Sequence, residues 1–246
     1  MVGVGWAGKR QIEAVRELDG DLEVVGLVDQ DAAHLKRVAT EFDIQRYSTE
    51  LDDVLSDPAI DAVSVCTPHG CHYRQSLRAI SAGKHVLVEK PMAVGVKEAD
   101  TMIREANRAG VCLYVAESQV YSPMSEWLRN IYQSSQYTGE VVSASVVQGF
   151  RAEVFRYPGR REWLTRPEMG GTGTWMLHGI HLVAQLKHVF GQVRSIYLKE
   201  HHALDFATPE IEGTMTGVIT MMSGLSVTIV LSCESRIKNG LGGVYL

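Results

Sequence analysis

The sequence predicts two units of different architecture. Residues 1–118 are predicted to form a doubly wound parallel α/β sheet, and residues 119–246 an α+β unit with a mostly antiparallel, open-faced sheet. Three observations favour this class: helical segments alternate with short apolar runs in the first half, long β-rich runs dominate the second half, and a glycine-rich turn precedes the first predicted helix.

The first half supplies the alternation that a parallel sheet needs. Apolar side chains recur at helical spacing among charged ones, which predicts helices over 7–18, 31–42, 71–82 and 95–109, and the capping-box spacing Thr49-Glu50-Leu51-Asp52 predicts a short helix that it opens and that runs through Leu55. Near-continuous apolar runs between them are typical of strands buried on both faces, which predicts strands over 22–28, 44–47, 60–66, 85–88 and 111–116.

The second half follows a different period. Residues 213–222 alternate threonine or valine with larger apolar side chains, then turn at Ser223-Gly224 into 225–233, which predicts a hairpin with one face wet or covered by a partner. Further strands are predicted over 141–147, 192–199 and the last residues, 240–246. Helices are predicted over 124–132 and 175–190.

The glycine-rich turn is Gly3-Val4-Gly5-Trp6-Ala7-Gly8, at the opening of the first helix. Glycines let the backbone turn tightly and approach a pyrophosphate, and the helix N–H groups then point at the negative charge. Asp29 ends the next strand about twenty residues later, where an acidic side chain holds the adenosine ribose hydroxyls of a Rossmann cofactor and repels a 2′-phosphate. NAD is therefore expected as cofactor, with NADP disfavoured. The alternative is that Asp29 caps the helix starting near Asp31.

Both ends of the chain are short for this fold. Only Met1 and Val2 precede Gly3, although a full central strand is expected to run up to the glycine turn. The last predicted strand likewise ends abruptly. We therefore expect a chain truncated at both ends, either a fragment of an active enzyme or a degenerate relative.

The composition of the chain argues against some classes of binding partner. The chain has 246 residues, 45% hydrophobic and 22% charged, with a formal net charge of −5 and no basic run, which argues against nucleic acid or an anionic membrane surface as main partner. The sequence contains no apolar run of membrane-spanning length and no signal peptide. Cys66 and Cys112 lie in apolar runs, so buried thiols in a reducing cytoplasm are expected.

Four motifs in order resemble the glucose–fructose oxidoreductase / inositol dehydrogenase (Gfo/Idh/MocA) family. They are the glycine turn, Thr67-Pro68 with His72, Glu89-Lys90-Pro91, and Gly170-Gly171-Thr172-Gly173 leading to His181. The resemblance implies an NAD(P)-dependent oxidoreductase that acts on a sugar, polyol or related hydroxy compound. It also implies that the second unit carries the substrate site and a homo-oligomer contact.

The resemblance assigns roles to single residues. Lys90 corresponds to the lysine at the reacting hydroxyl and nicotinamide ribose, and His181 to the histidine that contacts or deprotonates that hydroxyl. The cofactor is expected to contact Gly3, Gly5, Trp6, Ala7, Gly8, Asp29, Thr67, Pro68, His72, Glu89, Lys90 and, more loosely, Gln119. Histidine is a natural base near neutral pH, and a lysine can stabilise a developing alkoxide. The alternatives are a solvated surface lysine at 90 and a half-buried helix histidine with a backbone partner at 181.

The chain departs from the family in its second half. Leu177 stands where the family has an Asp four residues before the histidine, and Ala184 where Asp is also common. We hypothesise that His178 and His181 replace the Asp/His pair, the alternative being that His178 packs under the sheet. A metal is not expected, because no carboxylate or thiol near the two histidines completes a site.

Other functions stay open at this point. A relative could use bound NAD transiently in non-redox chemistry, as NAD-dependent glycosidases that resemble the family do, or could bind or assemble without catalysis. Guanidinium groups suit carboxylates, so the arginine-rich loop 150–166 raises an acidic sugar as a minority substrate hypothesis. Its arginines are Arg151, Arg156, Arg160, Arg161 and Arg166.

Overall fold

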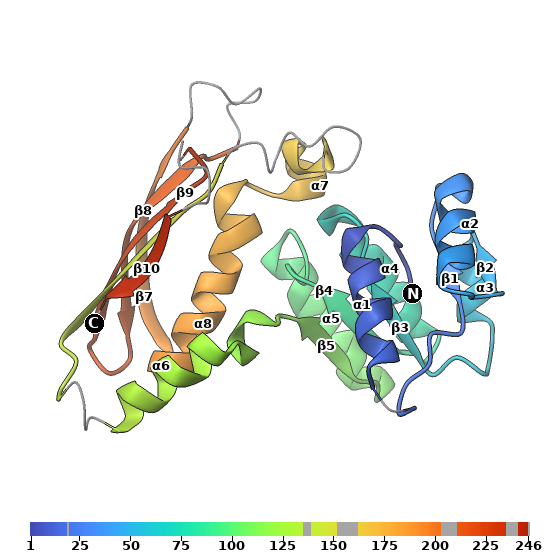
Figure 1. Ribbon diagram of the computed structural model, residues 1–246, viewed down its shortest axis with the longest axis horizontal. Helices are drawn as coiled ribbons and strands as arrows, with labels where there is room; N and C mark the ends of the chain where they lie inside the picture. The colour runs from blue at the N-terminus through green and yellow to red at the C-terminus, as the bar shows by residue number, and fades with distance from the viewer. Residues whose placement is uncertain (19, 135–138, 152–161, 203–210, 235–240, 246) are drawn as a thin grey trace. The chain divides into compact units, whose positions relative to one another are not determined.

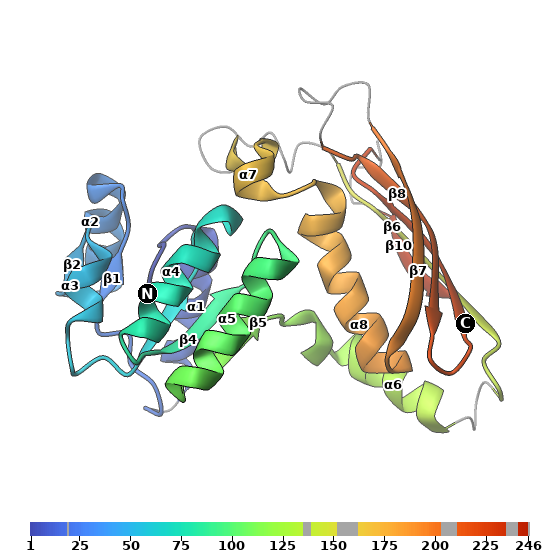
Figure 2. The ribbon, with the colours of Figure 1, turned by 180° about the vertical axis from the view of Figure 1, so that it is seen from behind.

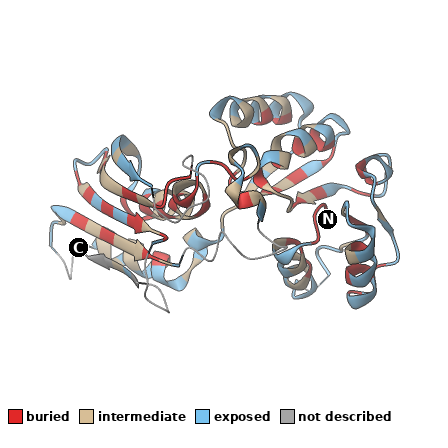
Figure 3. Cartoon of the chain, turned by 90° about the horizontal axis from the view of Figure 1, so that it is seen from above, coloured by how far each residue is buried: buried red, intermediate tan, exposed pale blue. Residues whose placement is uncertain are grey.

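The computed structural model describes residues 1–18, 20–134, 139–151, 162–202, 211–234 and 241–245 (Figure 1). The chain divides into two compact units, Met1–Ala116 and Glu117–Leu246. Each has its own buried interior, as Figure 3 shows. In the described part of the chain, every helix is too short or too polar to cross a membrane.

The first unit is a parallel sheet with helices, as the alternation predicts. Its helices are α1 (Trp6–Arg16), α2 (Ala32–Glu41), α3 (Leu51–Leu55), α4 (His69–Ser81) and α5 (Val96–Ala109). Its strands are β1 (Leu27–Val28), β2 (Tyr47–Ser48), β3 (Ala62–Val65), β4 (His85–Glu89) and β5 (Leu113–Ala116). The strands β3, β4 and β5 pair in parallel in that order, and β1 pairs in parallel with β2.

Val2 joins the two parts of this sheet. It forms parallel bridges to Val28 and to Val65, and its side chain is 2% exposed. Val2 thus occupies the central position that the fold class assigns to the strand before the glycine turn. The flanking Met1 carbonyl accepts the Val28 amide at 2.8 Å.

The predicted strand 22–28 is wrong over most of its length. Only Leu27–Val28 joins the ladder, and Leu22 is 59% exposed. A strand needs hydrogen-bonded neighbours beside it, and the bridge through Val2 reaches Val28 without extending to residues 22–26. Hydrophobicity alone therefore overestimated this element.

The second unit is built on one five-stranded sheet. Its strands are β6 (Ser143–Gly149), β7 (Val193–His201), β8 (Thr214–Met221), β9 (Ser226–Ser232) and β10 (Leu241–Tyr245). They pair in the order β10-β6-β9-β8-β7, with every pair antiparallel except β6–β9. The expected mostly antiparallel sheet and the hairpin through Ser223-Gly224 are confirmed.

Helices cover one face of this sheet (Figures 1 and 2). Helix α6 (Pro123–Ser134) packs beside α8 (Ile180–Phe190), and apolar residues of α8 form a core with β8 and β9. That core includes Leu182, Leu186, Ile219 and Ile229. On the opposite face, Tyr197 is 73% exposed.

The predicted helix 175–190 is not regular at its start. Residues Trp175–Gly179 form a wide π turn, in which the Ile180 amide donates to the Trp175 carbonyl, and α8 begins at Ile180. A Cβ on Gly179 would stand 2.4 Å from the Trp175 ring, so the indole packs directly on this glycine. The widened turn shifts the faces of residues before α8, which a constant helical period does not predict.

A buried carboxylate holds the start of this turn. Glu212, 2% exposed, accepts the Trp175 amide at 2.7 Å through Oε1, and its backbone bridges Gly173. Its Oε2 has no hydrogen-bond partner in the described structure. Burial raises the pKa of Glu212 above the ordinary 4.5.

Glu212 should therefore make folding pH-dependent. A raised carboxyl pKa contributes stability that is complete below about 4.5 and is lost as pH rises through the folded-state value. We expect the Tm of the wild type to fall, relative to that of Glu212→Gln, as pH rises above 4.5. The glutamine keeps an acceptor for Trp175 but does not titrate. Parallel Tm–pH profiles in differential scanning calorimetry would contradict this prediction.

The cysteines are free and differ in burial. Burial raises the pKa of Cys66 to about 12 and that of Cys233 to about 11, so both thiols resist ionisation. Cys112 is exposed, which makes the expectation that it is buried wrong. It directly precedes β5, and an apolar neighbourhood in sequence does not bury a residue outside the strand.

Candidate functional site

The three glycines of the N-terminal turn have different surroundings. Gly3 has φ +81°, and a Cβ there would stand 2.8 Å from the Cys66 carbonyl carbon. A Cβ on Gly8 would stand 2.1 Å from the Gly3 carbonyl oxygen, whereas one on Gly5 would meet no atom within 4 Å. Packing of the turn therefore requires Gly3 and Gly8, while Gly5 borders open space.

That open space lies at the start of a helix. Gly5 is the N-cap residue of the eleven-residue α1, and it offers no side chain to occupy the helix terminus. The next residue, Trp6, is 68% exposed. A helix N-terminus carries partial positive charge and N–H groups aimed along the axis, so this turn fits a phosphate group.

Asp29 ties the strand β1 to the glycine turn. Its Oδ2 accepts the Val4 amide at 2.9 Å, and its Oδ1 accepts the Asp31 amide at 3.1 Å. The cap of α2 is Asp31, whose side chain accepts the His34 amide at 2.9 Å. Asp31, and not Asp29, therefore caps α2. Asp29 lies beside the glycine turn, which is where a residue that binds the adenosine ribose must lie.

His72 links two loops at the carboxyl ends of β3 and β4. It is fully buried, with Nδ1 2.8 Å from the Pro91 carbonyl oxygen and Nε2 2.8 Å from the Thr67 carbonyl oxygen. Burial lowers the pKa of His72, and the two carbonyls oppose that effect. Pro68 is the N-cap residue of α4 and Thr67 donates to Gln75, so the His72 ring clamps the loop that carries both.

Glu89 and Lys90 follow β4 in the same region. Gln11 of α1 donates to Glu89 Oε1 at 2.7 Å and accepts the Ser64 hydroxyl, which connects the end of β4 to α1 and β3. The Lys90 amide donates to Glu89 Oε2 at 3.3 Å, and the Lys90–Pro91 peptide bond is cis. Lys90 is half-buried, unlike a fully solvated surface lysine.

In the second unit, His181 contacts a carboxylate that the sequence reasoning missed. His181 Nδ1 lies 2.6 Å from Glu117 Oε2, and Glu117 Oε1 accepts the Gln119 amide at 2.9 Å. The signal was present, because Glu117 directly follows β5, and the carboxyl ends of parallel strands are where functional groups gather. The expectation that no carboxylate lies near the histidine pair is therefore wrong.

His178 and Leu177 lie on different sides of the widened turn. The His178 ring packs at a tilt of 41° against Phe150, which follows β6, with 4.0 Å between the ring centroids. Its centroid is 6.3 Å from that of His181. Leu177 is 7% exposed in an apolar cluster with Leu164 and Cys233. Within the described parts of the chain, no group of three or more His, Cys, Asp or Glu could hold a metal ion.

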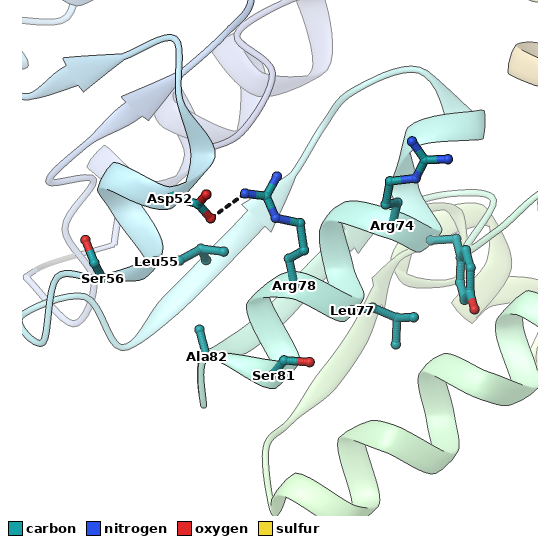
Figure 4. Close-up of a pocket in the computed structure, with 9 residues that line it drawn as sticks. Asp52, Leu55, Ser56, Arg74, Leu77, Arg78, Ser81 and Ala82 are labelled. Carbon is teal, nitrogen blue, oxygen red and sulfur yellow. Dashed lines mark hydrogen bonds and ion pairs between the residues drawn. The ribbon is translucent and has the colours of Figure 1, made fainter.

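Two hollows of the described surface are lined by residues other than the predicted site residues. One, of about 620 Å³, lies between α3 and α4, where Arg78 pairs with Asp52 (Figure 4). It is lined by Tyr73, which directly follows the buried His72 in α4, but not by Thr67 or His72. Another, of about 640 Å³, is lined by residues of 132–142 and 223–225. Of the arginine-rich loop, residues 152–161 lie outside the described residues.

The parallel sheet, the glycine turn clasped by Asp29 and the open antiparallel sheet define a two-unit protein built on a dinucleotide-binding Rossmann fold. The profile described as an oxidoreductase family with NAD-binding Rossmann fold matches residues 1–117, and the Gfo/Idh/MocA C-terminal domain matches residues 133–241. The chain belongs to the Gfo/Idh/MocA family.

Individual relatives agree with this assignment. The chain is 30% identical over 219 residues to a 1,5-anhydro-D-fructose reductase of Ensifer adhaerens, covering 87% of this chain and 62% of that protein. It is 32% identical to an uncharacterised oxidoreductase of Rhizobium meliloti, covering 89% of this chain and 63% of that protein. The chain thus spans less than two thirds of the length of these relatives.

A solved structure shares the fold. The WlbA dehydrogenase from Bordetella pertussis, in complex with NADH and UDP-GlcNAcA, superposes with a TM-score of 0.89 at 23% identity, covering 99% of this chain and 74% of that one. At 23% identity, this similarity shows a shared fold and no more.

Proposed function

We propose that the protein is an NAD(P)-dependent oxidoreductase that transfers a hydride between the nicotinamide and a CH–OH group of a sugar, polyol or related hydroxy compound. The observation that carries this proposal is the glycine turn, where Gly5 borders open space at the start of α1 and Asp29 is held beside it. Family membership and the names of relatives such as the anhydrofructose reductase support the substrate class.

The residues present fit a dinucleotide. We assign the pyrophosphate to the backbone of the glycine turn and the adenosine ribose to Asp29, whose negative charge favours NAD over NADP. The remaining cofactor contacts are assigned to Thr67, Pro68, Glu89, Lys90 and Gln119. The buried His72 is assigned the role of holding the loop that carries Thr67 and Pro68. When bound, the nicotinamide accepts or donates the hydride. The chain must orient the substrate and move the hydroxyl proton.

Lys90 and His181 are proposed to handle that oxygen and its proton. The Lys90 ammonium, half-buried at the end of β4, stabilises negative charge on the substrate oxygen. His181 takes the hydroxyl proton in oxidation and returns it in reduction. His178 is proposed to contribute to polarising the same hydroxyl.

Two alternative functions differ from this proposal in whether product forms and whether NADH accumulates. An enzyme that uses NAD transiently would form product without net NADH, and a binding or assembly relative would show no turnover. Homo-oligomerisation through the sheet of the second unit is also proposed, supported by exposed Tyr197 on the face opposite α8. A cytoplasmic location is proposed because the four cysteines are free, as in reducing compartments.

A substrate screen tests the proposed function. The purified chain and its Lys90→Met variant would be incubated with NAD or NADP and neutral sugars, polyols or sugar acids, with product analysed beside absorbance of reduced nicotinamide. We expect NADH to accumulate with the wild type and to be lost in the variant. Preference for uronates would favour the acidic-sugar hypothesis. Product without net NADH, or NAD binding without turnover of any substrate, would overturn the oxidoreductase proposal.

A further inference from the structure

We propose that Glu117 is a positioning residue for His181: its carboxylate accepts the Nδ1 proton and so presents Nε2 as the nitrogen that exchanges a proton with substrate. The role of His181 in catalysis rests on the proposed function. The pairing itself does not, because it belongs to the second unit without any ligand.

The geometry of the pair specifies a tautomer. A carboxylate only accepts hydrogen bonds, so the 2.6 Å contact between His181 Nδ1 and Glu117 Oε2 requires the proton on Nδ1. The neutral ring then carries its lone pair on Nε2. A carboxylate behind a histidine base orients the ring and stabilises the imidazolium that forms when Nε2 takes a proton.

The carboxylate is itself held in place. Glu117 Oε1 accepts a hydrogen bond from the backbone N–H of Gln119 at 2.9 Å. The backbone carbonyl of Gln119 accepts one from the Ser125 hydroxyl at 2.8 Å. The Glu117 side chain is 13% exposed and that of His181 is 21% exposed. Partial burial strengthens the interaction and limits exchange of either group with water.

The carboxylate comes from outside α8 because residues 175–190 contain no Asp or Glu. The π turn at Trp175–Gly179 places Leu177 in an apolar cluster with Leu164 and Cys233. His178 stacks on Phe150. The segment after β5 then brings a carboxylate to His181 from 64 residues earlier in the chain.

The chain offers a matched control two helical turns further along α8. His188 Nε2 lies 2.9 Å from Glu126 Oε1, but the Glu126 side chain is 46% exposed. This second pair joins α6 to α8 through the opposite ring nitrogen. Glu126→Gln removes a carboxylate that also pairs with a histidine of α8, and it leaves the Glu117–His181 contact in place.

The experiment reads the tautomer directly, in the whole chain without cofactor. Two-bond ¹⁵N–¹H correlations of ¹⁵N-histidine protein, recorded above the ordinary pH range of histidine titration, distinguish Nδ1–H from Nε2–H rings; His181→Asn assigns the signal. We expect the Nδ1–H form in the wild type and in Glu126→Gln, and a mixture in Glu117→Ala. Folding of each variant is checked by its Tm, and Glu117→Leu, whose side chain has no acceptor, serves if the alanine variant does not fold.

Kinetics complete the test once a substrate is known. We expect kcat to fall about 10- to 100-fold in Glu117→Gln with KM little changed, and Glu117→Asp to recover part of the loss, while Glu126→Gln leaves both constants unchanged. An unaltered His181 tautomer in Glu117→Ala or Glu117→Leu, or an unaltered kcat in Glu117→Gln, overturns the proposal. A wild type that turns over no substrate overturns the proposed function alone, and the tautomer then decides the role of Glu117.

Discussion

Replacing His181 with alanine is expected to lower kcat about 10²- to 10⁴-fold, the range by which a positioned acid–base group accelerates proton transfer. The ring is partly exposed, with Nδ1 fixed on Glu117, so Nε2 remains for the substrate proton. Alanine removes that proton acceptor but leaves the apolar face of α8 intact. Steady-state kinetics with the substrate found in the screen would measure the loss.

Alanine variants of two other histidines serve as comparisons for His181→Ala. His178→Ala should lower kcat by a smaller factor, because the His178 ring also packs on Phe150 and its centroid is 6.3 Å from that of His181. His188→Ala, on the same helix but paired with Glu126, should leave kcat unchanged. Undiminished activity in both His181→Ala and His178→Ala would remove this region from the mechanism.

Replacing Gly5 with alanine is expected to weaken NAD binding by at least about tenfold, equal to about 1.4 kcal/mol of binding free energy. The added methyl group meets no protein atom within 4 Å, and it would stand where the pyrophosphate must approach the start of α1. The Tm should change little, since the Gly5 φ of −69° suits alanine and the cap position loses no side-chain bond. Calorimetric titration with NAD measures the change in Kd.

Gly8 is the matched control for steric effects on the fold. A methyl group there would stand 2.1 Å from the Gly3 carbonyl oxygen, which forces the turn to move. We expect Gly8→Ala to lower the free energy of unfolding by about 1–3 kcal/mol, as overpacking does, and to lower the Tm. An unchanged NAD affinity in Gly5→Ala would contradict the placement of the phosphate at this turn.

Much of the fold could be predicted because each unit has a periodic signature. Strands buried on both faces read as apolar runs, as for Leu27 and Val28 of β1, while one-sided strands alternate, as in β8. The glycine turn and Asp29 were also predictable, because their spacing is local to one βαβ unit. The strand 22–28 was overestimated because pairing depends on neighbours, and within that stretch both Val2 and the two-residue β2 pair only with Leu27 and Val28.

The sequence by itself determined the order of elements, the two architectures and the family, because these depend on side-chain period and on motifs within short intervals. Only the tertiary structure decided that Gly5 faces open space, that Leu177 turns into an apolar cluster and that Glu117 meets His181. Those facts depend on a widened helical turn and on a contact across 64 residues. The packing of the folded chain determines such contacts, and the spacing of residues along the sequence does not predict them.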